Sequence, residues 1–193
     1  MLFNYSKLLI CFGIFFLSII MSLPQTFINK FTSNAIVETP RGCVNKYAFD
    51  KNSGLFKLKK VLPAGSSFPM NFGFIPHTVG EDGDPLDVLI LTDEACYPGC
   101  IVECNCIGVM AAQQSEGSKL VRNDRLMAVS TESLRFAKIK TSANLGMQMI
   151  NDLVHFFENY NRLRGKKFIF SGFKNKNAAI ALIKKSMIDD RDE

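Results

Sequence analysis

The chain has 193 residues, of which 47% are apolar and 21% are charged. This length and composition support one domain with a substantial hydrophobic core and are too small for two domains of ordinary size. The net charge of +5 suits an anionic ligand, but it falls short of the clustered basic surface of a nucleic-acid-binding protein, so we expect no nucleic-acid partner.

The beginning of the chain differs in composition from the remainder. Lys7 is followed by residues 8–23, which are almost entirely apolar and carry no charge. This pattern is typical of a secretory signal or a membrane anchor, although a span usually needs about 20 apolar residues. We therefore interpret residues 1–30 as a signal or anchor segment that would bring residues 8–23 to a membrane. The alternative is an apolar N-terminal extension without such a role, or a wrongly assigned start codon. The folded domain is expected at residues 31–193.

The cysteines do not indicate a disulfide framework. Beyond the apolar run the chain has five cysteines, an odd number without a C-x-x-C pair, which favours reduced thiols. Cys104 and Cys106 alternate within one apolar run and are most simply core residues. A zinc site is the alternative, but only His77 and His155 could complete it and neither has the spacing of a zinc ligand.

The first two thirds of the domain are rich in strand patterns. Short runs of β-branched and aromatic residues are separated by turn signals such as P-R-G and K-N-S-G, and no helical pattern interrupts them. Closely spaced strands of this kind favour a barrel or a sandwich. The predicted strands are residues 35–39, 44–50, 55–61, 72–75, 88–91, 101–110 and 125–129.

The last third changes to a helical pattern. Apolar residues recur at steps of three and four from Met149 to Leu163, which predicts an amphipathic helix over residues 145–163. A strand at 167–173 and a second helix at 178–188 complete the chain. The expected fold is a single α+β domain that is mainly β.

An acidic segment, G-E-D-G-D-P-L-D, occupies residues 80–87 and leads directly into an apolar strand. The carboxylates of Asp82, Asp84 and Asp87 would repel one another unless a cation lay among them, and such oxygen ligands suit Mg²⁺ or Mn²⁺. An EF-hand does not fit, because Leu86 stands where that loop needs an oxygen ligand. By spacing alone, a solvated acidic turn is an equal alternative.

The heptapeptide D-G-D-P-L-D-V at residues 82–88 is identical to the signature of the soluble family I inorganic pyrophosphatases. The resemblance covers about residues 36–173, in order. It implies a five-stranded OB-like barrel with flanking helices, and Mg²⁺-dependent hydrolysis of pyrophosphate to two phosphates. The flanking segments that resemble the family are V-E-T-P, N-K-Y-A-F-D-K, F-P-M-N-F-G-F-I-P-H-T, P-G-C-I-V, I-G-V-M, R-N-D-R-L-M-A-V and H-F-F-E-N-Y.

The resemblance also implies roles for the acidic residues. Asp82 and Asp87 would bind the first metal ion, and Asp87 would also reach a second. Asp84 would accept the proton of a water that bridges the two metals, and such a water is readily deprotonated and can attack phosphorus. Glu38 matches a family acid near a further metal bound with the substrate, although from the sequence alone it could equally be an exposed strand residue.

Positive and hydroxyl groups are needed opposite the metals, because phosphoryl transfer depends mainly on positioning and charge stabilisation. The resemblance assigns substrate binding to Lys46, Lys60, Arg125 and Tyr160. Taken singly, Lys60 would usually lie on a solvated strand face and Tyr160 in the core.

The chain departs from the usual family pattern at several site positions. The resemblance places Asn123 where a further metal ligand is expected, with Asp124 beside it and Glu116 upstream. We take Asp124 as that ligand and keep the other two as alternatives. The remaining departures are Ala48 for an acid, Phe68 and Phe72 for tyrosines, Lys60 for an arginine and Asn161 for a lysine.

The family resemblance implies a cytoplasmic homo-oligomer, whereas residues 8–23 suggest a membrane-anchored or exported protein. The resemblance also implies an acid in the segment around Gln113, and the chain has none there unless Glu116 takes its place. This absence leaves a second functional hypothesis, a barrel that binds metal and a phosphorylated ligand without hydrolysing it. A nucleic-acid-binding OB barrel is less favoured, because it predicts exposed aromatic residues and a basic groove, whereas this chain places carboxylates at the centre.

Overall fold

The computed structural model describes residues 24–188. The predictions for residues 1–23, including the apolar run 8–23, lie outside the described residues. Within the part that is described, none of the helices combines the length and the apolar composition needed to cross a membrane.

The structure contains every strand and helix predicted from the sequence and adds β7 and the short 3₁₀ helix η1. The strands are β1 Thr32–Thr39, β2 Asn45–Asp50, β3 Leu55–Val61, β4 Asn71–Phe74, β5 Asp87–Leu91, β6 Ile101–Glu116, β7 Lys119–Arg122, β8 Arg125–Ser130 and β9 Phe168–Lys174. The helices are η1 Ser142–Asn144, α2 Met147–Arg162 and α3 Lys176–Ser186.

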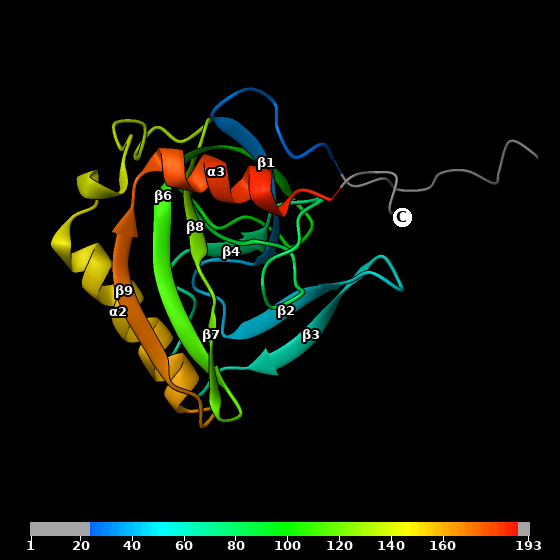
Figure 1. Cartoon of the computed structure of the whole chain (residues 1–193), viewed down its shortest axis with the longest axis vertical. Helices are drawn as coiled ribbons and strands as arrows, with labels where there is room; N and C mark the ends of the chain where they lie inside the picture. The colour runs from blue at the N-terminus through cyan, green and yellow to red at the C-terminus, as the bar shows by residue number, and fades with distance from the viewer. Residues whose placement is uncertain (1–23, 189–193) are drawn as a thin grey trace, which may run out of the picture.

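Five strands close into a barrel (Figure 1). β1 pairs with β4, β4 with β5, β5 with β8 and β8 with β6, and β6 returns to β1. Only the β5–β8 pair in this ring is parallel. Each strand of the ring therefore has two hydrogen-bonded neighbours, which removes free sheet edges. The prediction of a mainly β domain with a five-stranded OB-like barrel and flanking helices is confirmed.

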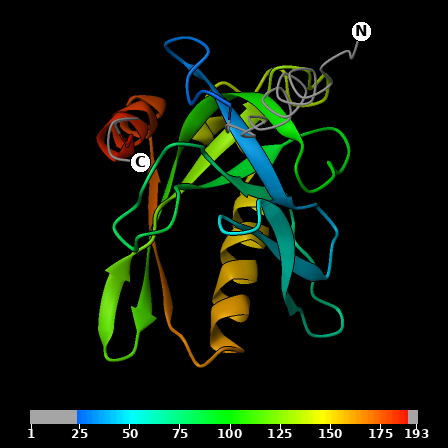
Figure 2. The same ribbon diagram turned by 90° about the vertical axis from the view of Figure 1, so that its right-hand side faces the viewer.

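Two hairpins extend from this barrel on either side of α2 (Figure 2). β6 is 16 residues long, and beyond the ring it continues in a hairpin with β7 while β9 pairs along its side. β2 and β3 form a separate two-stranded sheet. The strands of the barrel and these two hairpins supply most of the residues of the candidate site.

Alternating side chains of the barrel strands belong to two different cores. The first core includes Val88 and Ile90 of β5 and packs against α3, and the second includes Leu89 and Leu91 and packs against α2. All four side chains are almost completely buried, and burial of each contributes ~1.5–3 kcal/mol. The V-L-I-L run is therefore apolar on both faces and gives Asp87, at its beginning, a rigid attachment.

Gly73 of β4 permits β1 and β4 to approach closely. A Cβ at this position would lie 2.0 Å from the backbone oxygen of Ile36 in β1. Any side chain at residue 73 would therefore push apart the strands that carry Glu38 and Phe72, two residues of the candidate site.

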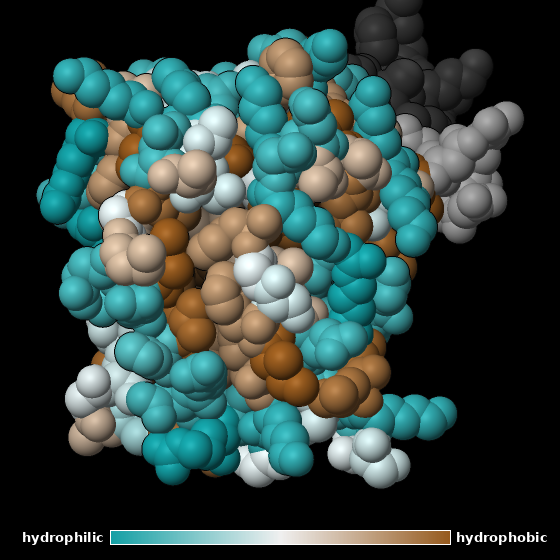
Figure 3. Space-filling view, turned by 60° about the vertical axis from the view of Figure 1, so that its left-hand side comes forward, coloured by the Kyte–Doolittle hydropathy of each residue, from teal (hydrophilic) through white to brown (hydrophobic). Residues whose placement is uncertain are grey.

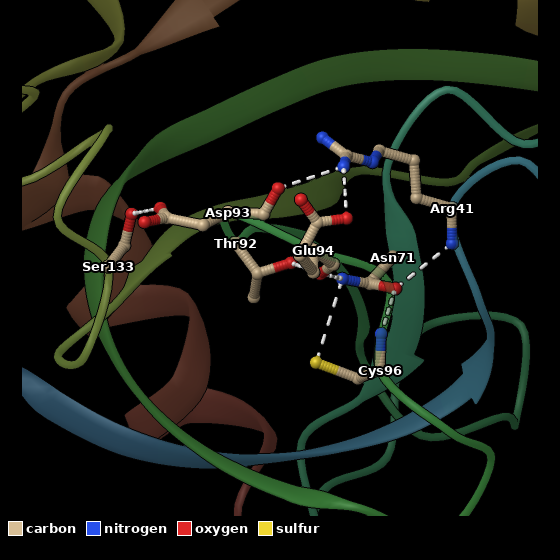
Figure 4. A network of polar contacts seen from close by, with 7 residues as sticks. All are labelled: Arg41, Asn71, Thr92, Asp93, Glu94, Cys96 and Ser133. Atoms are coloured by element: carbon tan, nitrogen blue, oxygen red, sulfur yellow. Dashed lines mark hydrogen bonds and ion pairs between the residues drawn. The ribbon is translucent and has the colours of Figure 1, made fainter.

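A polar network fixes the carboxyl end of β5 (Figure 4). The Asn71 side-chain oxygen accepts hydrogen bonds from the backbone N–H of Arg41 at 2.9 Å and of Cys96 at 3.1 Å. The Arg41 guanidinium donates to the backbone oxygen of Asp93 at 2.9 Å, and the Asp93 carboxylate accepts from Ser133. The network joins three loops at the end of β5 opposite to Asp87, so both ends of this strand are held.

One face of the molecule, on the side of α2 and β9, has apolar side chains gathered near its centre (Figure 3). Both elements carry exposed apolar residues, since Met147 of α2 is 70% exposed and Ile169 of β9 is 42% exposed. Contiguous apolar surface of this kind is common at protein–protein contacts.

Candidate active site

The acidic loop between β4 and β5 is folded by its own hydrogen bonds. The N–H of Gly80 donates to the backbone oxygen of Asp84 at 2.7 Å, and the N–H of Asp84 donates to the Asp82 carboxylate at 3.3 Å. Gly83 has a φ of 84°, a conformation that favours glycine. The N–H of Leu86 is fixed by the Thr78 hydroxyl at 3.0 Å. The loop therefore presents its carboxylates in a defined arrangement.

Asp87 lies where the loop enters the barrel, beside Arg125 on the neighbouring strand β8. Its carboxylate is 3.7 Å from the Arg125 Nε, and its side chain is 26% exposed. Burial raises the pKa of Asp87, and the charges of Arg125 and Lys46 oppose the increase. Ionised Asp87 is therefore destabilised unless a cation lies beside it. This property suits a metal ligand.

Arg125 lies beneath the site rather than on its surface. Only 4% of the residue is exposed, and its guanidinium carbon is 4.2 Å from the Phe157 ring centroid and 5.4 Å from that of Phe168. Its Nη1 donates to the backbone oxygen of Asn123 at 3.0 Å, and burial lowers its pKa. These contacts suit a residue that positions Asp87 better than one that binds substrate.

Glu38 of β1 faces the same region from the opposite side. Its carboxylate accepts a hydrogen bond from the N–H of Phe49 at 2.7 Å. Burial raises its pKa to about 7, opposed by the Phe49 hydrogen bond and Lys46 and assisted by the charges of Asp87 and Asp84. Glu38 is therefore a partly buried residue of the site rather than an exposed strand residue.

Two of the three cations predicted for substrate binding come from the β2–β3 hairpin. Lys46 of β2 and Lys60 of β3 are paired in register. The Lys46 Nζ lies 4.9 Å from the Phe72 ring centroid and 5.9 Å from that of Tyr160. Phe72, which the resemblance places where the family has a tyrosine, thus makes a cation–π contact with Lys46.

A cavity of about 520 Å³ brings most of the predicted residues together. Both carboxylates and cations line it. Its predicted site residues are Glu38, Lys46, Lys60, Asp84, Asp87 and Tyr160, and Arg164, which was not predicted, lines it as well.

A smaller cavity of about 130 Å³ lies on the other side of Asp87 and is lined by Asp82, Asn123 and Asp124. The Asn123 side chain donates to the Asp82 carboxylate at 3.3 Å. Burial raises the pKa of Asp82, and its hydrogen bond with the N–H of Asp84 opposes the increase. The residue at the position of a family metal ligand is therefore here a hydrogen-bond donor to another acid.

The Asp124 carboxylate is already occupied by protein groups. It accepts from the N–H of Ala112 at 3.1 Å and from the Arg122 Nε at 2.8 Å, and the Lys174 Nζ lies 3.7 Å away. Its side chain is 6% exposed. Glu116, the other acidic alternative, is 45% exposed and lies 3.6 Å from the Lys166 Nζ. The Asp124 carboxylate would have to give up protein partners to bind a metal ion, whereas the Glu116 carboxylate is partly exposed and only loosely paired.

The carboxylates of the site suit Mg²⁺ by their chemistry. Among residues 24–188, no three acidic, cysteine or histidine side chains form a preformed metal site. Mg²⁺ does not require one, because it usually takes one or two carboxylates and completes its shell with water and substrate phosphate. Asp82, Asp87 and Glu38, whose pKa values are all raised mainly by burial, have the properties expected of such ligands.

We expect the metal-free protein to lose stability between about pH 4.5 and pH 7. The folded protein holds the Glu38 proton more tightly than the unfolded chain does, so ionisation above pH 4.5 favours unfolding until Glu38 itself ionises near pH 7. The effect is on the order of 2 kcal/mol, because one pKa unit corresponds to ~1.4 kcal/mol and the side chain keeps some contact with solvent. Urea unfolding with EDTA at pH 5 and pH 8 measures it.

The matched variant is Glu38→Gln, which cannot ionise. Its stability should fall less than that of the wild type between pH 5 and pH 8, and Mg²⁺ added at pH 8 should stabilise the wild type more. Equal pH dependence in the two proteins would contradict the assignment of a raised Glu38 pKa.

The closed barrel and the cavity, which is lined by both carboxylates and cations, suit a protein that acts on a phosphorylated anion with the help of metal ions. The sequence model of a family described as inorganic pyrophosphatase matches residues 35–190. The chain belongs to this inorganic pyrophosphatase family.

Individual relatives agree with this placement. The inorganic pyrophosphatase of Geobacillus stearothermophilus is 35% identical over 161 residues, which cover 82% of this chain and 93% of the relative. That of Rickettsia conorii is 36% identical over 159 residues, covering 80% and 90%. The crystal structure of the inorganic pyrophosphatase from Thermus thermophilus superposes with a TM-score of 0.79 at 32% identity, covering 86% of this chain and 94% of that one.

Proposed function

We propose that this chain hydrolyses inorganic pyrophosphate to two phosphates with Mg²⁺ as the cofactor, and that Mn²⁺ can replace it. The observation that carries the proposal is the cavity of about 520 Å³, in which Glu38, Asp84 and Asp87 share one space with Lys46, Lys60 and Tyr160. A small anion with phosphate groups at both ends needs cations at its oxygens and a base beside the attacking water. The cavity has side chains of both kinds.

Asp82, Asp87 and Glu38 would hold the metal ions. Bound Mg²⁺ would neutralise these carboxylates and lower the pKa of the attacking water. Asp84 would accept the proton of this water, since it is exposed to solvent and lies in the loop beside the metal ligands. Asp124 is left out of the proposed ligand set because Arg122 and Lys174 already pair with it.

The cations and Tyr160 would bind the substrate from the other side. Lys46 and Lys60 would contact phosphate oxygens as point charges, and the Tyr160 hydroxyl would donate a hydrogen bond. We propose that Arg125 acts through Asp87 instead of contacting pyrophosphate, because its guanidinium is buried against Phe157.

Phosphate release tests this proposal. The purified full chain, freed of metal with EDTA, should release phosphate from pyrophosphate only after Mg²⁺ or Mn²⁺ is added in excess of the chelator. Inorganic phosphate is measured with a colorimetric assay. Absence of release with both metals would overturn the proposed function.

The second hypothesis is a barrel that binds metal and a phosphorylated ligand without turnover. The observation in its favour is that Asn123 and the paired Asp124 take the place of free acids near the site. Titration calorimetry separates the two hypotheses, because binding of pyrophosphate and Mg²⁺ without phosphate appearing over hours would favour the binding protein.

The family resemblance also leads us to propose a homo-oligomer in the cytoplasm. The apolar surface on the side of α2 and β9 supports self-association. Attachment to a membrane or export through residues 8–23 is the alternative for localisation. Sedimentation of the purified chain and fractionation of cells that express it check the two statements.

A further inference from the structure

Asn161 does not supply the charge that the family resemblance places after Tyr160. Asn161 is completely buried, and its Nδ2 donates to the backbone oxygen of Phe157, one turn earlier in α2, at 2.9 Å. The side chain therefore points into the molecule and is used by the helix. A cation for this part of the cavity has to come from another residue.

Arg164 brings a cation to the cavity from just beyond the end of α2. The chain turns after Arg162, and the N–H of Arg164 donates to the backbone oxygen of Asn161 at 2.9 Å. This turn places the Arg164 guanidinium carbon 5.2 Å from the Tyr160 ring centroid, with Nη1 3.4 Å from the Tyr160 hydroxyl. Arg164 lines the same cavity as Glu38, Asp84 and Asp87.

The charges around Arg164 favour an anion. Lys60 lies near enough that Arg164 contributes, after burial, to the lowered pKa of Lys60. Within residues 24–188, no carboxylate forms an ion pair with either side chain. Two adjacent cations without an acidic partner repel each other, and a bound anion would remove that repulsion.

We infer that Arg164 is a substrate-binding residue, which binds a terminal phosphate of pyrophosphate together with Lys60. This inference rests on the proposed function. An arginine can hold two phosphate oxygens with its planar fork, whereas the lysine expected at residue 161 would act as a point charge. The contact with the Tyr160 ring and the hydrogen bond to its hydroxyl restrict the Arg164 side chain and reduce the side-chain entropy lost on binding.

Substitution of Arg164 tests the inference by two measurements. Arg164→Gln should raise the KM for pyrophosphate about tenfold and change kcat less, because a charge-assisted hydrogen bond to phosphate is lost. The same variant should bind imidodiphosphate, a non-hydrolysable analogue, about tenfold more weakly in calorimetry with excess Mg²⁺. Arg164→Lys should recover part of the loss.

Arg162→Gln is the matched control. Arg162 is an exposed arginine two residues away whose Nη2 bonds the Asn159 side chain at 3.1 Å, and it does not line the cavity. Its KM and affinity for imidodiphosphate should equal those of the wild type. Thermal unfolding of both variants verifies that they are folded.

The same substitution made in a Tyr160→Phe variant tests whether Arg164 acts only by orienting the Tyr160 hydroxyl. In Tyr160→Phe, which lacks the hydroxyl, Arg164→Gln should still weaken imidodiphosphate binding about tenfold. The inference is overturned if Arg164→Gln binds the analogue like Arg162→Gln, or if its effect disappears in the Tyr160→Phe background.

The calorimetric measurement keeps this inference separate from the proposed function. A wild-type chain that binds imidodiphosphate without hydrolysing pyrophosphate would disprove the hydrolase and still test Arg164. A wild-type chain that neither binds imidodiphosphate nor releases phosphate from pyrophosphate would disprove both. A chain that releases phosphate without binding the analogue would leave the proposed function standing, and the KM of Arg164→Gln would then test the inference.

Discussion

Asp84→Asn should lower the kcat for pyrophosphate by about 10²- to 10⁴-fold, the range over which a positioned general base contributes. Asparagine has the shape of aspartate but cannot accept the proton of the attacking water. The Asp84 residue is exposed, and among residues 24–188 its carboxylate has no ion-pair partner. The substitution therefore should leave the fold intact, and phosphate release under excess Mg²⁺ measures its effect.

Glu81→Gln is the control for Asp84→Asn. Glu81 is an exposed acid in the same loop, and its carboxylate lies 3.8 Å from the Lys185 Nζ at the end of α3. We assign it no role in the reaction, so its variant should retain activity within about twofold and a similar melting temperature. Asp84→Asn activity above a tenth of the wild-type value would exclude Asp84 as the general base.

The barrel could be predicted because its strands are short, β-rich and separated by clear turn signals. The closure of the barrel came from the resemblance, since strand spacing alone fits a sandwich equally well. β7 was not predicted because residues 119–122 are mostly exposed and lack an apolar alternation. That hairpin matters, because β7 ends at Arg122, which binds Asp124.

The environment of a site residue was harder to predict than its identity. The Asp124 carboxylate meets groups from β6, β7 and β9, and only the strand pairing brings Ala112, Arg122 and Lys174 to one place. Arg164 was missed for a similar reason. Its position depends on the turn that ends α2, and a sequence pattern does not determine in which direction the chain leaves a helix.

Arg125→Met should destabilise the protein by ~3–5 kcal/mol, because removal of one partner leaves the carboxylate of Asp87 without its compensating charge in a largely buried position. Methionine keeps most of the side-chain volume, so the contact with Phe157 is largely preserved and the missing charge dominates the result. The free energy of unfolding in urea, measured with EDTA near pH 7, gives this value.

Arg135→Met is the comparison at the surface, because Arg135, like Arg125, packs against a phenylalanine ring. The Arg135 guanidinium carbon lies 5.3 Å from the Phe136 ring centroid, but the residue is exposed. Its substitution should cost less than ~1 kcal/mol. Equal losses for the two arginine variants would show that burial of the Arg125 charge has no special importance.

The double variant Asp87→Asn/Arg125→Met distinguishes a positioning role for Arg125 from substrate binding. If Arg125 acts by balancing Asp87, removal of both charges should cost at least ~1 kcal/mol less than the sum of the single losses. The losses in Mg²⁺ affinity should also be smaller in the double variant than the sum of the single losses, since Asp87 is the proposed metal ligand and lies 3.7 Å from Arg125. Additive losses would instead mean that the two side chains act independently, and Arg125 would return to the set of candidate substrate ligands.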